Sequence, residues 1–360
     1  MSKRIWKFLG WDSTTTWRHF VLSFLATFVG GLAVIQLFVL LIDPYNIVPF
    51  ALPIERRIVS ISQRHMYPQI VRSRRFDSFI VGTSTSRLLD PELLNGPFHA
   101  RFANLAMDAM TAWEQWAMID LFIREVGAPK ASIVGIDGVW CEEQADRKRT
   151  TFRGFPDWLY DNNRWNDYLY QLNAGTVEIA GRLVGYQLGL YPERVRGDGF
   201  AVFTPPEQEY ELARASSNIW GTAKRTLPPK QPPLSLSDAE RKTLRFPALR
   251  WLDDALARQP GATVKILAYM PVHVAAQPIS GTISAAIEAE CKARIATIAR
   301  TRGAKVVDWR IQSAITTADV NYWDDVHFRL PIAQRIARDL APAILDGRDS
   351  FDATYQLVVQ

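Results

Sequence analysis

Two short segments near opposite ends of the chain carry residues that together could perform nucleophilic chemistry. The first, residues 82–87 (GTSTSR), places hydroxyls directly after an apolar run, and Ser84 is its leading candidate nucleophile. A serine hydroxyl is a weak nucleophile unless a base, an orienting group and donors for the developing oxyanion accompany it. The alternative is a Ser or Thr cap at a helix N-terminus, which this segment taken alone favours.

The second segment, residues 321–328 (NYWDDVHF), supplies a base and an orienting group. Asp324 and His327 are separated by two residues. A carboxylate fixes the tautomer of an imidazole and stabilises the imidazolium that forms when a serine proton is taken. The spacing is common, and its alternative is a surface loop with one solvated histidine. Because the segment follows the last strand-like run and precedes a helix starting near Pro331, we expect His327 to meet Ser84.

Three further residues are candidates for the same pocket. His273 follows an apolar run and is expected to contact the substrate or support the base, since no carboxylate lies near it in sequence. Arg87 and Arg329 each follow a candidate residue closely and could bind an anionic sugar or carboxylate, with solvated arginines as an equal alternative. No metal-ligand spacing and no nucleotide-binding glycine motif is evident, so no cofactor is predicted.

The elements that position these residues alternate along the chain. Short apolar runs lie at 78–82, 132–136, 264–269 and 304–309, and helical patterns lie at 111–126, 284–302 and 331–345. Strands that alternate with helices predict an α/β domain with a largely parallel sheet. Ligands bind beyond the carboxyl ends of such strands, where the candidates lie.

The N-terminal region contains a run without charge, residues 20–42, which is long enough to cross a membrane. It exceeds the apolar region of a signal peptide, so we predict an uncleaved transmembrane anchor over a cleaved signal or a buried helix. Four basic residues and one acidic residue, Asp12, precede this run. The basic residues are Lys3, Arg4, Lys7 and Arg18. The positive-inside rule then places residues 1–19 in the cytoplasm and the main domain in the periplasm or cell exterior.

The remaining chain is divided by composition into a juxtamembrane segment 43–74, an α/β domain 75–346 and a tail 347–360. An aromatic insertion at 141–237 interrupts the α/β pattern and is expected to form a cap, with core packing favoured over stacking on sugars. The juxtamembrane arginines could face lipid headgroups or an anionic polymer, and the net charge of +5 does not require nucleic acid as a partner. Whether Cys141 and Cys291 pair is left open.

Taken together, these segments resemble the SGNH (GDSL-like) hydrolase superfamily. Its first block is a strand followed by Gly-x-Ser, here 82–84, and its last is Asp-x-x-His, here 324–327. Its second block, Asn-x-Gly followed by Thr, corresponds to 104–106 (NLA) with Thr111. The resemblance implies a flavodoxin-like three-layer fold, Ser84 as nucleophile, His327 as base, Asp324 as orienting group, and an oxyanion hole made by the N–H groups of Ser84 and Ala106.

The same resemblance assigns Asn104 and Asp137 to the substrate-binding side of the site. The family's third block, Gly-x-Asn, appears here as 135–137 (GID), with Asp137 in place of an asparagine donor. An ionised carboxylate would oppose a developing oxyanion. Asp137 therefore points away, is protonated, or has a different role.

With the anchor included, the chain looks most like membrane-tethered SGNH-like proteins of bacterial envelope polymer modification, such as alginate O-acetylation and teichoic-acid D-alanylation. That likeness implies a single-pass protein of the bacterial inner membrane that acts on an envelope polysaccharide or another acyl ester, beside a membrane-bound O-acyltransferase. Hydrolysis and transfer are both open. The alternative is a non-catalytic protein of the same fold that binds polymer or scaffolds an envelope complex.

Overall fold

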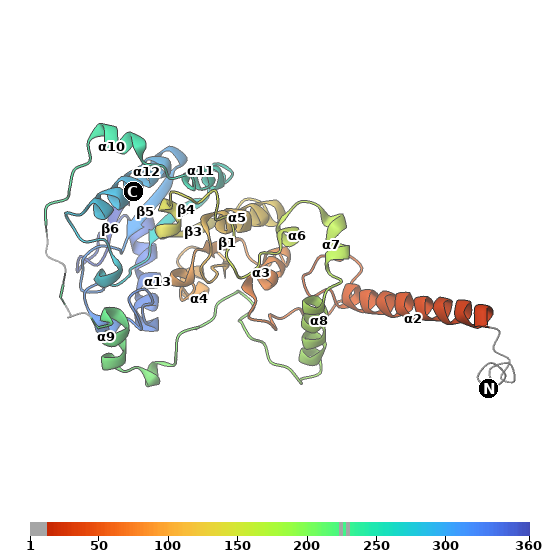
Figure 1. The fold of residues 1–360 in the computed structure, drawn as a ribbon. Helices are drawn as coiled ribbons and strands as arrows, with labels where there is room; N and C mark the ends of the chain where they lie inside the picture. The colour runs from red at the N-terminus through yellow and green to blue at the C-terminus, as the bar shows by residue number, and fades with distance from the viewer. Residues whose placement is uncertain (1–12, 223–225, 228–230) are drawn as a thin grey trace. The chain divides into compact units, whose positions relative to one another are not determined.

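The computed structural model describes residues 13–222, 226–227 and 231–360, so Lys3, Arg4, Lys7 and Asp12 lie outside the described residues. Two compact units are present (Figure 1): a helical unit, Met1–Val59 with Asn162–Pro192, and a sheet unit, Ser60–Asp161 with Glu193–Gln360. The aromatic insertion 141–237 is therefore divided between the units and does not form a single cap. The tail 347–360 belongs to the sheet unit.

The sheet unit is built on six strands in the order β2-β1-β3-β4-β5-β6. The first five are parallel, and β6 runs antiparallel to β5. Their inner residues are buried on both faces, as expected for apolar runs in a parallel sheet. The strands are β1 Ser78–Val81, β2 Phe102–Asn104, β3 Ala131–Ile136, β4 Val264–Tyr269, β5 Ala304–Asp308 and β6 Gln356–Val359.

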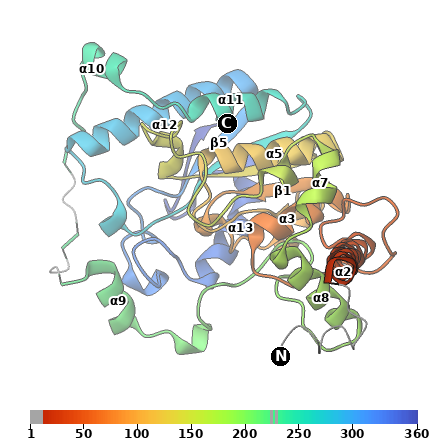
Figure 2. The same cartoon turned by 45° about the vertical axis from the view of Figure 1, so that its right-hand side comes forward.

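Helices cover both faces of the sheet because successive strand residues point to opposite sides. Phe79 packs on Phe122 of α5, with ring centroids 4.8 Å apart. The next residue, Ile80, belongs to a core cluster with Leu94 of α4 and Ile336 of α13. Figure 2 shows α5, α11 and α12 together on one side of the strands. The main helices of this unit are α3 Gln63–Arg72, α4 Pro91–Asn95, α5 Ala112–Val126, α11 Leu249–Ala257, α12 Ile283–Arg302 and α13 Leu330–Leu345.

Shorter elements connect this framework. They are the helices α6 Asp157–Tyr160, α9 Leu212–Trp220 and α10 Asp238–Thr243, and the 3₁₀ turns η1 Ser84–Ser86, η2 Gly138–Cys141, η3 Glu207–Glu209, η4 Val274–Ala276 and η5 Asp319–Asn321. Ser237 caps α10 through a capping box with Glu240. The chain then passes Pro247 before α11 begins at Leu249.

Two of the juxtamembrane arginines are buried in the sheet unit instead of facing lipid or polymer. Arg64 in α3 pairs with Glu114 at 2.7 Å, and both side chains are almost fully buried. Arg72 donates to the backbone carbonyl of Leu159 at 2.6 Å. The region after residue 59 is thus part of the folded sheet unit.

The helical unit contains α2 Ser13–Ile42, α7 Arg164–Tyr170 and α8 Ala174–Gln187. Within α2, the stretch Trp17–Ile42 is long and apolar enough to span a membrane. Its side chains are exposed over most of this length and become buried only toward Ile42, where α8 packs beside it (Figure 1).

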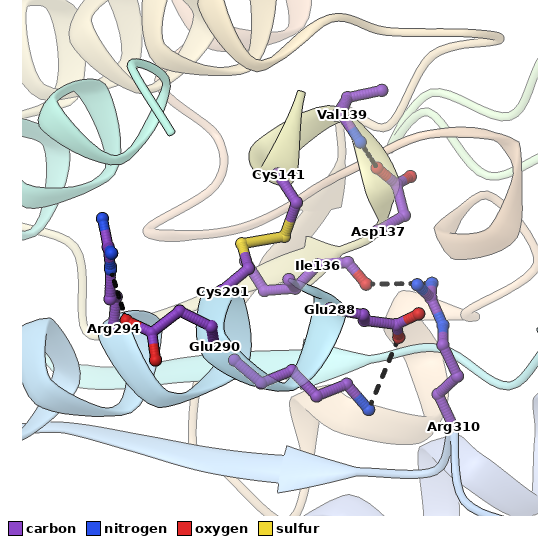
Figure 3. Close-up of a disulfide and its surroundings, with 10 residues drawn as sticks. Ile136, Asp137, Val139, Cys141, Glu288, Glu290, Cys291, Arg294 and Arg310 are labelled. Carbon is purple, nitrogen blue, oxygen red and sulfur yellow. Dashed lines mark hydrogen bonds and ion pairs between the residues drawn. A yellow bond between two sulfur atoms is a disulfide. The ribbon is translucent and has the colours of Figure 1, made fainter. Parts of the chain in front are cut away.

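Cys141 and Cys291 form a disulfide, which resolves the alternative left open by the sequence. The bond joins η2, directly after β3, to the buried face of α12 (Figure 3). It closes a loop of 150 residues that contains the whole divided insertion. A disulfide across so long a loop restricts the unfolded chain strongly.

Candidate active site

Ser84, His327 and Asp324 meet at the carboxyl end of the sheet. Ser84 opens η1 directly after β1, and its Oγ lies 2.8 Å from Nε2 of His327, although 243 positions separate them. Nδ1 of His327 lies 2.8 Å from Oδ2 of Asp324. With Nδ1–H donating to the carboxylate, Nε2 is the nitrogen that can accept the Ser84 proton. The expected contact between the two distant segments is therefore present.

The loop before α13 holds Asp324 in a fixed orientation. Its Oδ1 accepts the backbone N–H groups of Val326 at 2.8 Å and His327 at 2.7 Å, which leaves Oδ2 for the imidazole. Burial raises the pKa of Asp324, but the hydrogen bonds from the His327 ring and from these two amides outweigh it, and the pKa is lowered overall. The orienting group is thus ionised at neutral pH, while about a third of each side chain stays exposed to a substrate.

Two glycines let η1 approach the sheet closely. Ser86 is fully buried, and a Cβ built on Gly135 of β3 would lie 2.0 Å from its Oγ. A Cβ on Gly82 would lie 2.4 Å from the same atom. Glycine is therefore required at both positions for the turn carrying Ser84 to pack as it does.

Asn104 positions the Ser84 turn and does not face a substrate, which corrects its predicted role. The side chain is 1% exposed, and its Nδ2 donates to the carbonyls of Ser86, Arg87 and Leu89. Its Oδ1 accepts the N–H of Ala106 at 3.1 Å. The amide assigned by resemblance to the oxyanion hole is thus engaged by Asn104 in this structure.

Asp137 follows β3 and is held by two donors. Thr83 Oγ1 donates to its Oδ2 at 2.5 Å, and the Val139 N–H donates to its Oδ1 at 3.2 Å. Burial raises the pKa of Asp137, the Thr83 bond and the Arg310 charge oppose it, and the pKa is raised overall. Figure 3 shows Asp137 beside Val139, with the Arg310 guanidinium at the carbonyl of Ile136. Thr83, missed by the sequence reasoning, links Asp137 to the residue next to Ser84.

His273 is fully buried, so of its two expected roles the structure favours support of the base over contact with a substrate. Its Nε2 lies 3.3 Å from Oδ1 of Asp319, which is also buried. The rings of Trp220 and Tyr322 stand edge-on to it at 5.3 and 5.4 Å. A carboxylate partner does exist, but it lies 46 positions further along the chain, where sequence spacing gives no signal.

The two arginines predicted to bind an anionic substrate are instead engaged within the sheet unit. Arg87 is buried, pairs with Asp108 at 2.5 Å and lies 4.4 Å from the ring centre of Phe203. Phe203 also stands edge-on to His327 at 5.5 Å. No local pattern marked Phe203, because only the fold brings it to the histidine.

Arg329 is held in the same way. It donates to Glu207 at 2.8 and 2.5 Å and lies 3.7 Å from the ring centre of Tyr210. Both arginines thereby fasten the later part of the insertion around the site. Their charges are balanced by carboxylates of the chain itself.

The arrangement is a hydroxyl, an imidazole and an ionised carboxylate in line, accessible from outside and suited to acyl transfer. Across residues 13–222, 226–227 and 231–360, no group of three or more His, Cys, Asp or Glu side chains could hold a metal ion. The chain matches no protein-family model and no curated protein.

Proposed function

We propose that this protein is an SGNH-like esterase or O-acyltransferase that uses Ser84, His327 and Asp324 as its catalytic residues. The observation that carries the proposal is the pair of 2.8 Å contacts from Ser84 to His327 and from His327 to Asp324. A structural cap needs neither contact. A hydroxyl aligned on an oriented imidazole is the feature that nucleophilic catalysis requires.

The sheet supports the flavodoxin-like, SGNH-like part of the proposal. The order β2-β1-β3-β4-β5 is that of flavodoxin-like sheets, whose ligands bind beyond the carboxyl ends of the strands. Ser84, Ala106 and Asp137 follow β1, β2 and β3, and these three strands are neighbours. Fold alone does not set the reaction, so the catalytic argument rests on the side chains.

In the proposed reaction, Ser84 Oγ attacks the carbonyl carbon of an acyl ester while His327 Nε2 takes its proton. Asp324 stabilises the imidazolium that results. The tetrahedral intermediate collapses when His327 returns the proton to the leaving alcohol, which leaves the acyl group on Ser84. Water then yields an acid, or a sugar hydroxyl yields a new ester, with His327 acting again as base.

The oxyanion would be bound by backbone amides. The Ser84 N–H is the first of η1, and such amides have no acceptor within their own turn. The Ala106 N–H would exchange Asn104 Oδ1 for the oxyanion, or share itself between them. The raised pKa of Asp137 favours its neutral form and so lessens the repulsion of a nearby oxyanion.

The proposed location is the bacterial inner membrane, with α2 as a single-pass anchor, the N-terminus in the cytoplasm and the sheet unit in the periplasm or outside the cell. The length and exposure of α2 support the anchor. The Cys141–Cys291 disulfide supports an oxidising compartment for the sheet unit. An envelope polysaccharide is then the proposed acceptor or substrate, with a membrane-bound O-acyltransferase as a partner.

The test uses the full chain in lipid nanodiscs with an activated acetyl ester, with and without a polysaccharide acceptor. We expect turnover by the wild type and its loss in Ser84→Ala. Ser86→Ala, which removes a buried hydroxyl from the same turn, is the matched control and should retain turnover. Activity that is unchanged in Ser84→Ala would overturn the mechanism.

A second function, polymer binding without catalysis, is favoured by Asp137 in place of an amide donor and by the engagement of Ala106 with Asn104. It predicts that a folded wild type retains polysaccharide on a column but neither hydrolyses nor transfers acetyl. The same preparation therefore discriminates the two functions.

A further inference from the structure

The helical unit exposes large apolar side chains beyond the spanning helix itself. They come from three segments that are distant in sequence: the loop after α2, helix α7, and the end of α8. Each side chain is at least 44% exposed, and they are Phe50, Leu52, Trp165, Leu169, Leu188 and Leu190. Large apolar side chains exposed in such number in one compact unit mark contact with a membrane or another protein.

Two of these segments are bonded directly to the last turns of α2. The N–H of Leu52 donates to the carbonyl of Leu41 at 2.8 Å. Nε2 of Gln36 donates to the carbonyl of Tyr168 in α7 at 2.5 Å. Gln36 precedes Ile42 by six residues, which places this contact about 9 Å inside the end of the helix. Leu52 of the loop and Tyr168 of α7 thus contact the last turns of the apolar helix.

The Gln36 contact has the chemistry expected away from water. Gln36 is a polar side chain within the uncharged run, and the Tyr168 carbonyl is one of the last four of α7, which have no N–H donor within the helix. The Nε2 group of Gln36 and the Tyr168 carbonyl satisfy each other, while Gln36 Oε1 is buried without a hydrogen-bond partner among the described residues. Inside a bilayer an amide without such a bond would be costly, whereas in water it needs none.

The third segment is fixed by α8, which packs on α2 (Figures 1 and 2). Tyr45 Oη and Thr176 Oγ1 lie 3.1 Å apart and are buried. Gln187 at the end of α8 donates to the carbonyl of Glu55 at 2.6 Å, next to Leu188 and Leu190. All three segments are therefore anchored within one compact unit, around one end of the apolar helix.

We infer that these six residues form a collar that embeds in the bilayer leaflet on the Ile42 side. The ligand is the lipid surface, with acyl chains against the leucines and the headgroup boundary against Trp165. Trp and Tyr are the side chains enriched at that boundary. The continuity of the collar with α2, through Gln36 and Leu41, favours lipid as its occupant. The inference rests on the proposed spanning role of α2.

The test measures lipid contact at single positions in the full chain. The two native cysteines bond to each other, so an introduced cysteine is the one free thiol for an environment-sensitive fluorophore. Leu169→Cys and Leu190→Cys report on the collar, and Leu25→Cys reports on the middle of α2. Lys242→Cys, on the fully exposed helix α10, is the aqueous reference. Labelled proteins are placed in nanodiscs with or without lipids that carry a quencher on the acyl chain.

We expect quenching and blue-shifted emission at positions 25, 169 and 190, and neither at 242. If position 25 is quenched while 169 and 190 behave like 242, the collar is overturned and the anchor stands. If position 25 is not quenched, the anchor fails and the collar with it. Blue-shifted emission at position 169 in native membranes but not in nanodiscs would mean that a protein partner covers this surface. That result would overturn the lipid contact.

Discussion

The sheet unit contains two histidine–carboxylate pairs whose surroundings differ sharply. His327 and Asp324 are about one third exposed, and a serine hydroxyl lies 2.8 Å from the free ring nitrogen. His273 and Asp319 are at most 1% exposed, and aromatic rings stand against the imidazole. The same two side-chain types therefore occupy a reactive position in one place and a packed position in the other.

The two pairs are also connected. The backbone N–H of His273 donates to the carbonyl of Asp325, beside the accessible pair, and Asp319 accepts from Ser216 of α9 at 2.6 Å. The buried pair thus stabilises the loop that carries His327, through the hydrogen bond from His273 to Asp325. The comparison teaches that access and an aligned hydroxyl, more than a histidine next to a carboxylate, distinguish a site for chemistry from a site for packing.

The largest expected effect is on the accessible pair. His327→Ala should lower the acyl-transfer rate by on the order of 10⁴- to 10⁶-fold with little change in stability, because the base is lost from a partly exposed position. Ser84→Ala should be equally damaging, and the double variant scarcely worse, since the two residues act as a unit. Turnover of an acetyl ester measures all three. A double variant that is far slower than either single variant would contradict a shared role.

Asp324→Asn should give the next largest effect, a loss of up to about 10⁴-fold. The amide keeps the shape of the carboxylate but sets the wrong imidazole tautomer. Rates across pH, together with circular dichroism to verify folding, check this prediction. A rate within a factor of a few of wild type would show that Asp324 does not orient the base.

His273→Ala tests the other side of the comparison. Removing one partner of a buried pair should lower the free energy of unfolding by about 3–5 kcal/mol. The fraction that remains folded should lose far less activity than His327→Ala does. Denaturant unfolding and turnover below the unfolding transition measure the two quantities. A His273→Ala variant that is as stable as wild type but as inactive as His327→Ala would contradict the packing role of His273.

Gly135→Ala tests whether the placement of the hydroxyl turn matters. The new Cβ would meet Ser86 at 2.0 Å, so we expect a loss of about 1–3 kcal/mol and displacement of η1. Gly138→Ala is the matched control, because its Cβ would meet nothing within 4 Å. Unfolding and turnover of both variants check the prediction. Equal effects at the two positions would rule out the close approach as the cause.

The smallest effect concerns Asp137 and pH. Because its pKa is raised in the folded protein, the folded state binds this proton more tightly than the unfolded state. Wild-type stability is therefore lost as pH rises from the ordinary aspartate value of about 4 through the raised pKa. Asp137→Asn lacks this loss, so its stability relative to wild type should increase from acidic to neutral pH. Denaturant unfolding of both proteins between acidic and neutral pH measures this difference. If the pKa of Asp137 were lowered in the folded state, the stability of Asp137→Asn relative to wild type would instead decrease over this range.

Local patterns were enough to predict four strands and the three residues of the proposed triad. Strands β1, β3, β4 and β5 are short apolar runs. Ser84 lies in a Gly-x-Ser motif and His327 in an Asp-x-x-His motif, and each motif is visible from residue spacing alone. Strand β2 has only three residues, and β6 lies in a partly exposed tail, so neither gave a periodic signal. The α/β class with a mostly parallel sheet and the N-terminal apolar helix were thus predictable from the sequence.

What the sequence could not supply are the partners chosen by the tertiary fold. Asn104 was expected at the substrate, but its amide is used to hold the Ser84 turn. Arg87 and Arg329 were expected to bind an anionic substrate or to be solvated, but Arg87 pairs with Asp108 and Arg329 with Glu207. Rings of the insertion, Phe203 and Tyr210, lie against them. The insertion itself looked like one cap because its aromatic composition is uniform, whereas its middle packs with α2.

The most direct test of the central claim is covalent labelling of the full-length protein with a fluorophosphonate probe, followed by mapping of the modified residue by mass spectrometry. The probe reacts with a serine only when a base activates it. We predict that the wild type is labelled on Ser84, and that labelling is lost in Ser84→Ala and strongly reduced in His327→Ala. A folded wild type that takes no label, or is labelled elsewhere, would contradict catalysis by Ser84.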